Sequence, residues 1–169
     1  SPDNLATLVE GVVKRFKKPV ITKLTPNVTS ITEIAVAAET AGSTAISLIN
    51  TVSAIGVNMM GKSMTTGLGK AGLSGPAIKP IALKMVWDVN QNIEIPIIGM
   101  GGITNTSDAL EFILAGASAI SVGTANFTRP NTMVEIIQGL ESYVIENDLR
   151  NIQDIRGQLG DVRNTKKFF

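Results

Sequence analysis

The chain has 169 residues, of which 44% are hydrophobic and 17% charged, and its formal net charge is +1. A chain of this size corresponds to one globular domain, and its balanced charge argues against a disordered acidic segment or a basic nucleic-acid-binding arm. The apolar runs are far shorter than the roughly 18 residues that a membrane-spanning helix needs. We therefore expect neither a nucleic acid nor a membrane as a partner.

The sequence contains no cysteine and no histidine. Disulfides are thereby excluded, together with the usual ligands of zinc, haem and iron–sulfur clusters, and we expect no metal site. The commonest general base is missing as well, so a catalytic function would need a cofactor. Residues 1–4 lack the features of a signal peptide, which favours a cytoplasmic location.

Periodicity predicts the first elements in chain order. Apolar residues at helical spacing indicate a helix from Pro2 to Phe16, started and capped by Pro2 and Asp3. A short β-rich run at 19–24 indicates a buried strand that ends in a turn. Ser30 begins a capped helix that ends before Gly42, and a second strand follows at 45–49.

Helix and strand signals fail between Asn50 and Gly75, which predicts an irregular loop. Met59, Met60 and Met64 lie in this loop, where filling gaps in the core is the default role of methionine and a lid over a flat ligand is the alternative. After this loop, predicted helices and strands alternate again. The remaining predicted elements are a helix at 76–89, a strand at 95–98, a helix at 106–114 capped by Thr106 or Ser107, a strand at 119–122, a helix at 131–146 and a peripheral helix with a frayed end in the basic tail 156–167.

Four strand–helix units with buried strands predict a parallel sheet covered by helices, arranged as an open wound sheet or as a barrel. Glycine or polar residues follow every strand, which favours a barrel whose site lies at the carboxyl ends of its strands. Four units are half of eight. The predicted fold is an α/β TIM (β/α)8 barrel, of which residues 1–169 supply about the last four units as the C-terminal part of a single domain.

Polar residues at the strand ends are the candidates for chemistry. Lys23 lies near the end of an apolar strand, where a solvated position is not expected, and its charge can stabilise an anion; a lysine that reaches out to water is the alternative. Asn50 and Thr51 end the second strand and can hold an amide or a carboxylate, although the pair also suits an ordinary turn.

Glycines after the third and fourth strands indicate a phosphate site. Gly101 and Gly102 follow one strand, and Gly123 and Thr124 follow the other, so backbone amides can approach a phosphate closely near a helix start. Ser74 can donate to the same ligand or simply cap the next helix. Trp87 and Phe127 are interpreted as core or interface residues.

Several strings together resemble the C-terminal half of class 1 dihydroorotate dehydrogenases, most closely the type B branch. The strings are 23–27 (KLTPN), 49–51 (INT), 72–78 (GLSGPAI), 98–102 (IGMGG) and 122–127 (VGTANF). The resemblance covers essentially the whole chain and implies a barrel that binds flavin mononucleotide (FMN) and oxidises dihydroorotate to orotate in pyrimidine synthesis.

The resemblance also implies roles for individual residues. Lys23 would contact the pyrimidine end of the flavin, Ile49 its ring system, and Asn50 and Thr51 the orotate. The FMN ribityl chain and phosphate would be lined by Ser74, Gly75, Gly101, Gly102, Gly123 and Thr124.

The catalytic base of the family is a cysteine in type B enzymes, or a serine elsewhere, on a loop of the N-terminal half. This chain has no cysteine and no segment that matches that loop, so its catalytic residue is unknown and we expect the chain to be part of a longer polypeptide. The resemblance further implies a homodimer and, for type B, a second subunit that carries FAD and an iron–sulfur cluster.

Three alternatives remain open. Dihydropyrimidine dehydrogenase carries similar strings but acts on uracil or thymine. A half barrel that only binds a phosphate ligand or an assembly partner needs no catalytic base. A phosphosugar barrel enzyme would use the same glycines without needing Lys23, Asn50 and Thr51 in this arrangement.

Overall fold

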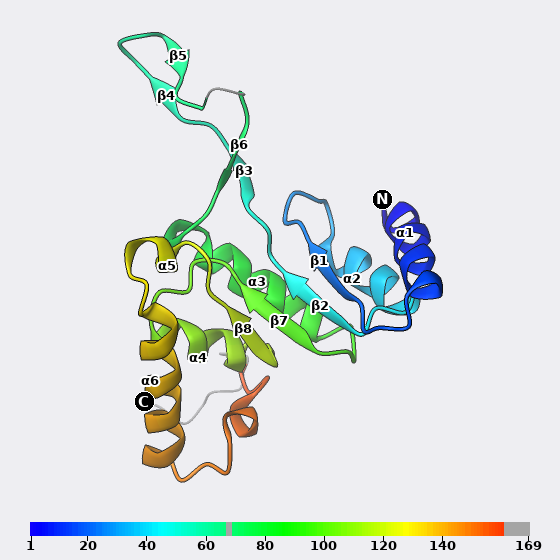
Figure 1. The fold of residues 1–169 in the computed structure, drawn as a ribbon, viewed down its shortest axis with the longest axis vertical. Helices are drawn as coiled ribbons and strands as arrows, with labels where there is room; N and C mark the ends of the chain where they lie inside the picture. Colours follow the sequence, from blue (N-terminus) through cyan, green and yellow to red (C-terminus); the bar gives the residue numbers. More distant parts are fainter. Residues whose placement is uncertain (67–68, 161–169) are drawn as a thin grey trace.

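The computed structural model describes residues 1–66 and 69–160 and contains a four-stranded parallel sheet (Figure 1). Its strands are β1 (Ile21–Leu24), β2 (Ala45–Leu48), β7 (Ile97–Met100) and β8 (Ala119–Ser121), and they lie in this order across the sheet. All three neighbouring pairs are parallel. The four predicted strands are therefore confirmed, with boundaries that differ by about two residues at most.

Helices connect these strands and pack on one face of the sheet, as predicted for an α/β protein. Contacts join α2 to β1 and β2, α3 to β7, and α4 to β8. The helices are α1 (Pro2–Arg15), α2 (Ile31–Thr40), α3 (Lys79–Asn90), α4 (Thr106–Leu114), α5 (Ala125–Thr128) and α6 (Thr132–Glu146), with 3-10 turns η1 (Pro76–Ile78) and η2 (Ile152–Ile155). In the described part of the chain, no helix has the length and apolar character needed to cross a bilayer.

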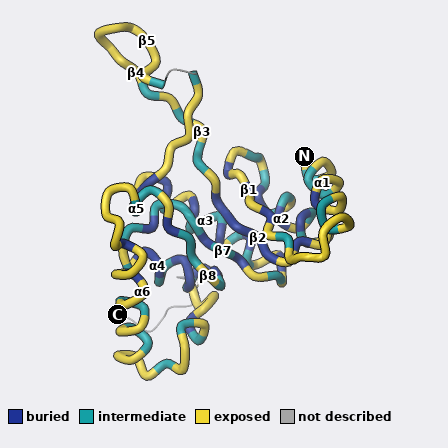
Figure 2. Tube along the Cα trace, viewed as in Figure 1, coloured by how far each residue is buried: buried dark blue, intermediate teal, exposed yellow. Residues whose placement is uncertain are grey.

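Side chains alternate between a buried and a more exposed face along β1 and β7, whereas all four residues of the central strand β2 are buried. Leu24, Leu48 and Ile97 lie in the core, and Phe112 of α4 packs so closely on Gly99 that an added Cβ there would lie 2.6 Å from its ring. On the opposite face Ile21 is 54% exposed and Lys23 is exposed. Figure 2 shows the buried residues concentrated along the strands and the helices behind them.

The segment predicted as an irregular loop instead forms an arm of two short antiparallel hairpins. Strand β3 (Val52–Ala54) pairs with β6 (Ala71–Leu73), and β4 (Val57–Asn58) pairs with β5 (Ser63–Met64). Figure 1 shows the arm extending away from the sheet and helices. The prediction failed because strands of two or three residues carry no measurable alternation.

The interpretation of several large apolar side chains was also wrong. Met59 and Met60 are 85% and 96% exposed in the arm, and Met64 is exposed too, so they fill no gap in the core. Phe127 is 91% exposed and Trp87 is also exposed, which excludes a core position for either; an interface role stays a prediction.

Helix ends differ from the predictions at three points. Ser1, not Asp3, caps α1, and Asn105, not Thr106 or Ser107, caps α4 by accepting from the Asp108 amide. The C-terminal helical turn is η2, which precedes the predicted tail helix, and residues 156–160 are not helical. The rest of that predicted helix, 161–167, lies outside the described residues.

Candidate functional site

A cavity of about 300 Å³ lies at the carboxyl ends of the sheet strands. Its walls come from β1, from the segments that follow β2, β7 and β8, and from the turn before η1. All ten residues predicted from the sequence line it: Lys23, Ile49, Asn50, Thr51, Ser74, Gly75, Gly101, Gly102, Gly123 and Thr124. The structure therefore brings the candidates together, whereas their individual roles stay predictions.

Lys23 is the one charged residue among the described residues that line the cavity, and no carboxylate lines it. The expectation that Lys23 would not be solvated was wrong. Its neighbours Thr22 and Leu24 point to the helices and are buried, so Lys23 points to the other, exposed face of the sheet. A single ammonium group without an acid beside it favours an anionic ligand over a cationic one.

Asn50 and Thr51 lie at the base of the arm, where hydrogen bonds fix the backbone. The Asn50 Oδ1 accepts from the Thr51 amide (2.8 Å). Asn27 Nδ2 donates to the Thr51 carbonyl (3.0 Å), and Asn27 Oδ1 accepts from the Ser53 amide (2.9 Å). From the sequence, Asn27 was expected only to belong to the turn after β1. Its two hydrogen bonds also connect that turn to the arm, which the sequence did not reveal because the partners are 24 and 26 residues away.

The loop after β7 takes a shape that requires glycine. Gly101 and Gly102 have φ values of +129° and +78°, in the range that side chains rarely adopt. A Cβ on Gly102 would lie 2.9 Å from the Gly75 carbonyl oxygen and from the Lys79 nitrogen. At Gly123, by contrast, an added Cβ would meet no atom within 4 Å. Two glycines thus allow close packing of the loop, and the third leaves open space at the cavity wall.

Ser74 and Thr124 join two walls of the cavity. The Thr124 hydroxyl donates to Ser74 Oγ (2.8 Å). The alternative interpretation of Ser74 as a helix cap was wrong, because the residue before η1 is Gly75 and no side chain caps that turn. Both residues line the cavity; the Ser74 hydroxyl keeps its own hydrogen as a donor, whereas the Thr124 hydroxyl, which donates to Ser74, is left as an acceptor.

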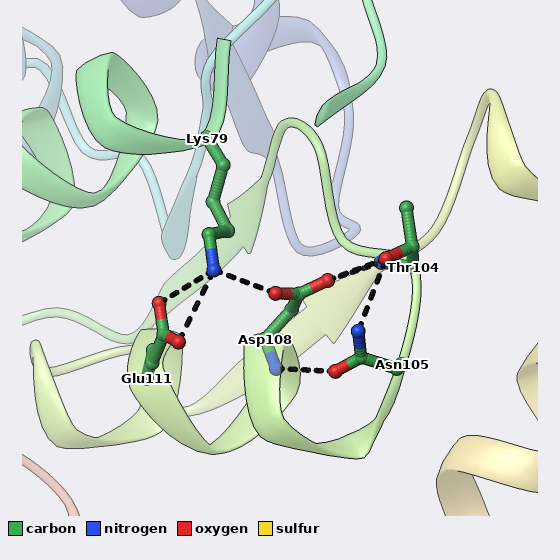
Figure 3. Close-up of polar contacts among 5 residues, drawn as sticks. All are labelled: Lys79, Thr104, Asn105, Asp108 and Glu111. Carbon is green, nitrogen blue, oxygen red and sulfur yellow. Dashed lines mark hydrogen bonds and ion pairs between the residues drawn. The ribbon is translucent and has the colours of Figure 1, made fainter. Parts of the chain in front are cut away.

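Sequence reasoning missed an ionic cluster beside the cavity, formed by Lys79, Asp108 and Glu111 (Figure 3). Lys79 Nζ lies 2.6 Å from Asp108 Oδ1 and 2.9 Å from Glu111 Oε2. Asp108 Oδ2 accepts from the amide (2.8 Å) and the hydroxyl (2.7 Å) of Thr104, which lines the cavity. The sequence held no signal for this cluster, because Lys79 and Asp108 are 29 positions apart.

The cluster stabilises the charged forms of both Lys79 and Asp108. Hydrogen bonds to Asp108 and then Glu111 raise the pKa of the Lys79 amine above its ordinary 10.5. Burial by itself raises the pKa of the Asp108 carboxyl, but the hydrogen bonds from Lys79 and Thr104 together outweigh burial and hold this pKa below its ordinary value. In the described residues, no group of three or more acidic side chains is close enough to hold a metal ion.

The fold and the site define a parallel α/β protein with a ligand-sized cavity at the carboxyl end of its sheet, walled by glycine loops and one lysine. The chain belongs to the dihydroorotate dehydrogenase family, whose model matches residues 1–144. The resemblance noted in the sequence is thereby confirmed.

Curated relatives named dihydroorotate dehydrogenase B (NAD(+)), catalytic subunit, support the type B branch. Those from Desulforamulus reducens and Caldicellulosiruptor bescii are 54% and 51% identical over 153 and 158 residues, which cover 90% and 94% of this chain and 50% and 53% of theirs. The relative from Lachnoclostridium phytofermentans is 46% identical over 156 residues, 92% of this chain and 52% of its own. The chain spans about half the length of the relatives it matches.

Proposed function

We propose that this chain is the C-terminal half of the FMN-binding (β/α)8 barrel of a type B dihydroorotate dehydrogenase, which oxidises dihydroorotate to orotate in pyrimidine biosynthesis. The observation that carries the proposal is the meeting of all ten predicted residues around one cavity at the carboxyl ends of the sheet strands. The names of the relatives supply the substrate, and barrel enzymes place their sites at this end of the strands.

The cavity fits FMN in its chemistry. The glycines at 101, 102 and 123 would offer backbone amides to a phosphate, and the Ser74 hydroxyl, which accepts from Thr124, would offer a further donor. The absence of a lining carboxylate among the described residues removes repulsion of a dianion. Apolar side chains of Ile49 and Ile78, both buried, provide a surface for a flat ring.

Bound FMN would supply the acceptor for the hydride that dihydroorotate loses. Lys23 would stabilise negative charge on the pyrimidine end of the flavin, because it is the cation of the cavity wall. Asn50 and Thr51 would hold the orotate ring, since the backbone between them is fixed by the Asn50 side chain and by Asn27. Ile49 would pack on the ring system of the flavin.

The rest of the enzyme would come from outside these residues. Strands β1 and β8 form the two edges of the parallel sheet, and each would pair with a strand of the other half of the barrel. That half would also supply the catalytic base. A homodimer, a second subunit with FAD and an iron–sulfur cluster, NAD as acceptor and a cytoplasmic location complete the proposal.

Flavin reduction tests the proposal. The full natural polypeptide, reconstituted with FMN, is mixed anaerobically with dihydroorotate or with dihydrouracil, and the flavin absorbance is followed. Bleaching by dihydroorotate alone is the expected result. Bleaching by dihydrouracil alone would instead establish a dihydropyrimidine dehydrogenase, and a protein that stays colourless after FMN addition would refute flavin binding.

A further inference from the structure

The cluster of Lys79, Asp108 and Glu111 joins two helices, α3 and α4, that are distant in the sequence. Lys79 is the first residue of α3, and its two partners lie on α4. The side chain of Asp108 is 9% exposed and that of Lys79 27%. None of the three residues lines the cavity, although Ile78 and Thr104, next to the cluster, do.

Asp108 connects the cluster to the glycine loop through Thr104. One carboxylate oxygen of Asp108 accepts a hydrogen bond from Lys79 Nζ. The other accepts hydrogen bonds from both the amide and the hydroxyl of Thr104. The Thr104 carbonyl in turn accepts from Arg129 Nη2 (3.1 Å), which lies after α5. Thr104 is therefore fixed at its amide, hydroxyl and carbonyl, two residues after Gly102.

Lys79 also packs against the loop through its backbone nitrogen and its Cβ. The nitrogen and the Cβ of Lys79 each lie 2.9 Å from the position that a Cβ on Gly102 would occupy. Lys79 therefore packs against Gly102 near its backbone, and the end of its side chain is held by Asp108. The loop is clamped from the α3 side by this contact and from the α4 side by Thr104.

Stability alone is a weak reason for such a cluster. A buried ion pair often contributes no more to stability than well-packed apolar residues of similar volume, because desolvation offsets the attraction. A hydrogen-bonded carboxylate does fix geometry, since its two oxygens specify where each donor must lie. Binding improves when donors are held in the bound arrangement before the ligand arrives.

We propose that Lys79 and Asp108 are positioning residues that hold the backbone amides of the Gly101–Gly102 loop in place for the phosphate of the ligand. The inference rests on the proposed function, because it takes the phosphate of FMN as the group that this loop receives. Lys79 acts here through the loop rather than by its charge, which its carboxylate partners already neutralise.

Binding of FMN and of riboflavin, which lacks the phosphate, separates positioning from a general loosening of the fold. The two dissociation constants are measured by flavin fluorescence for the full natural polypeptide, for Lys79→Met and for Lys84→Met. Lys84 is a matched control, because it also lies on α3 and pairs with an acid, Asp88, but is exposed and does not line the cavity. Asp108→Asn, nearly isosteric, serves as a second variant should Lys79→Met not fold.

We expect Lys79→Met to raise the dissociation constant for FMN about tenfold, in line with the loss of hydrogen bonds between charged groups, and that for riboflavin less than about twofold. Asp108→Asn should change the two constants in the same pattern, and Lys84→Met should change neither. Equal weakening of both ligands, or no weakening, would overturn the inference.

Hydrogen exchange of the ligand-free proteins keeps this test separate from the test of the proposed function. Failure of the unsubstituted protein to bind FMN would refute the proposed function. In that case the exchange rates of the amides from Gly102 to Thr104 still test whether Lys79 and Asp108 hold the loop in place. Faster exchange there in Lys79→Met than in Lys84→Met supports the clamp. Equal exchange in the two variants overturns it.

Discussion

Replacement of Gly102 by alanine tests whether the backbone conformation after β7 is required by the fold. Gly102 has a φ of +78°, and an added Cβ would lie 2.9 Å from the Gly75 carbonyl oxygen and the Lys79 nitrogen. The left-handed conformation costs about 1 kcal/mol with a side chain. Overpacking against backbone atoms, which cannot rotate away as a side-chain end can, adds roughly 1–3 kcal/mol. We therefore expect Gly102→Ala to lower the free energy of unfolding by about 2–4 kcal/mol.

Urea titration followed by circular dichroism measures this difference, and Gly123→Ala is the matched control. Gly123 also belongs to a glycine loop of the cavity, but an added Cβ there meets no atom within 4 Å. Its replacement should change the free energy of unfolding by less than about 0.5 kcal/mol. Equal midpoints for the two variants would show that the loop after β7 relaxes without cost, and would refute the close packing inferred for it.

Three further predictions concern charge and exposure. Lys23→Ala should slow single-turnover reduction of bound FMN by dihydroorotate about 10²- to 10³-fold, through the loss of a positioned charge; an unchanged rate contradicts its role. The depressed pKa of Asp108 means that its stabilisation is complete above its ordinary 3.8 and is lost as the pH falls through the lower folded value. The urea midpoints of the unsubstituted protein and of Asp108→Asn should thus converge as the pH falls below 3.8, whereas a constant difference between them would contradict this stabilisation. Met60→Ser, at a side chain 96% exposed, should change the free energy of unfolding by less than about 0.5 kcal/mol, and a larger loss would place Met60 in a packed contact.

The sheet and the cavity lining were predictable because their signals are local. Each strand is a short apolar run, and each is followed within a few residues by the polar or glycine residues that line the cavity, such as Asn50 and Gly101. Because the carboxyl ends of parallel strands lie along the same edge of a sheet, these residues meet there irrespective of how the helices are arranged. Knowledge of the strand ends was therefore enough to bring seven of the ten residues together. Ser74 was predicted from the turn before the next helix, and Ile49 and Gly75 only from the family resemblance.

The arm and the ionic cluster were not predictable because both depend on distant pairs. Strand β3 pairs with β6 some twenty residues away, and neither is long enough to show alternation. Lys79 meets Asp108 across 29 positions, and both are common residue types on helices. The exposure of Lys23 was misjudged for a related reason, since the sequence shows that a strand is apolar but not which face the helices cover.

The distribution of chemistry over the site suggests how the proposed enzyme divides its work. Beside apolar side chains, the described cavity wall in this half carries backbone amides, hydroxyls, a carboxamide and one ammonium group, and the chain has no histidine or cysteine. Such groups can bind and orient a ring and an anion, but near neutral pH none of them is a competent base for a carbon-bound proton. Cofactor binding would thus belong to this half and proton abstraction to the other. Substitutions at the glycine loops should then impair flavin binding, whereas loss of the base should leave the flavin bound and only its reduction slowed.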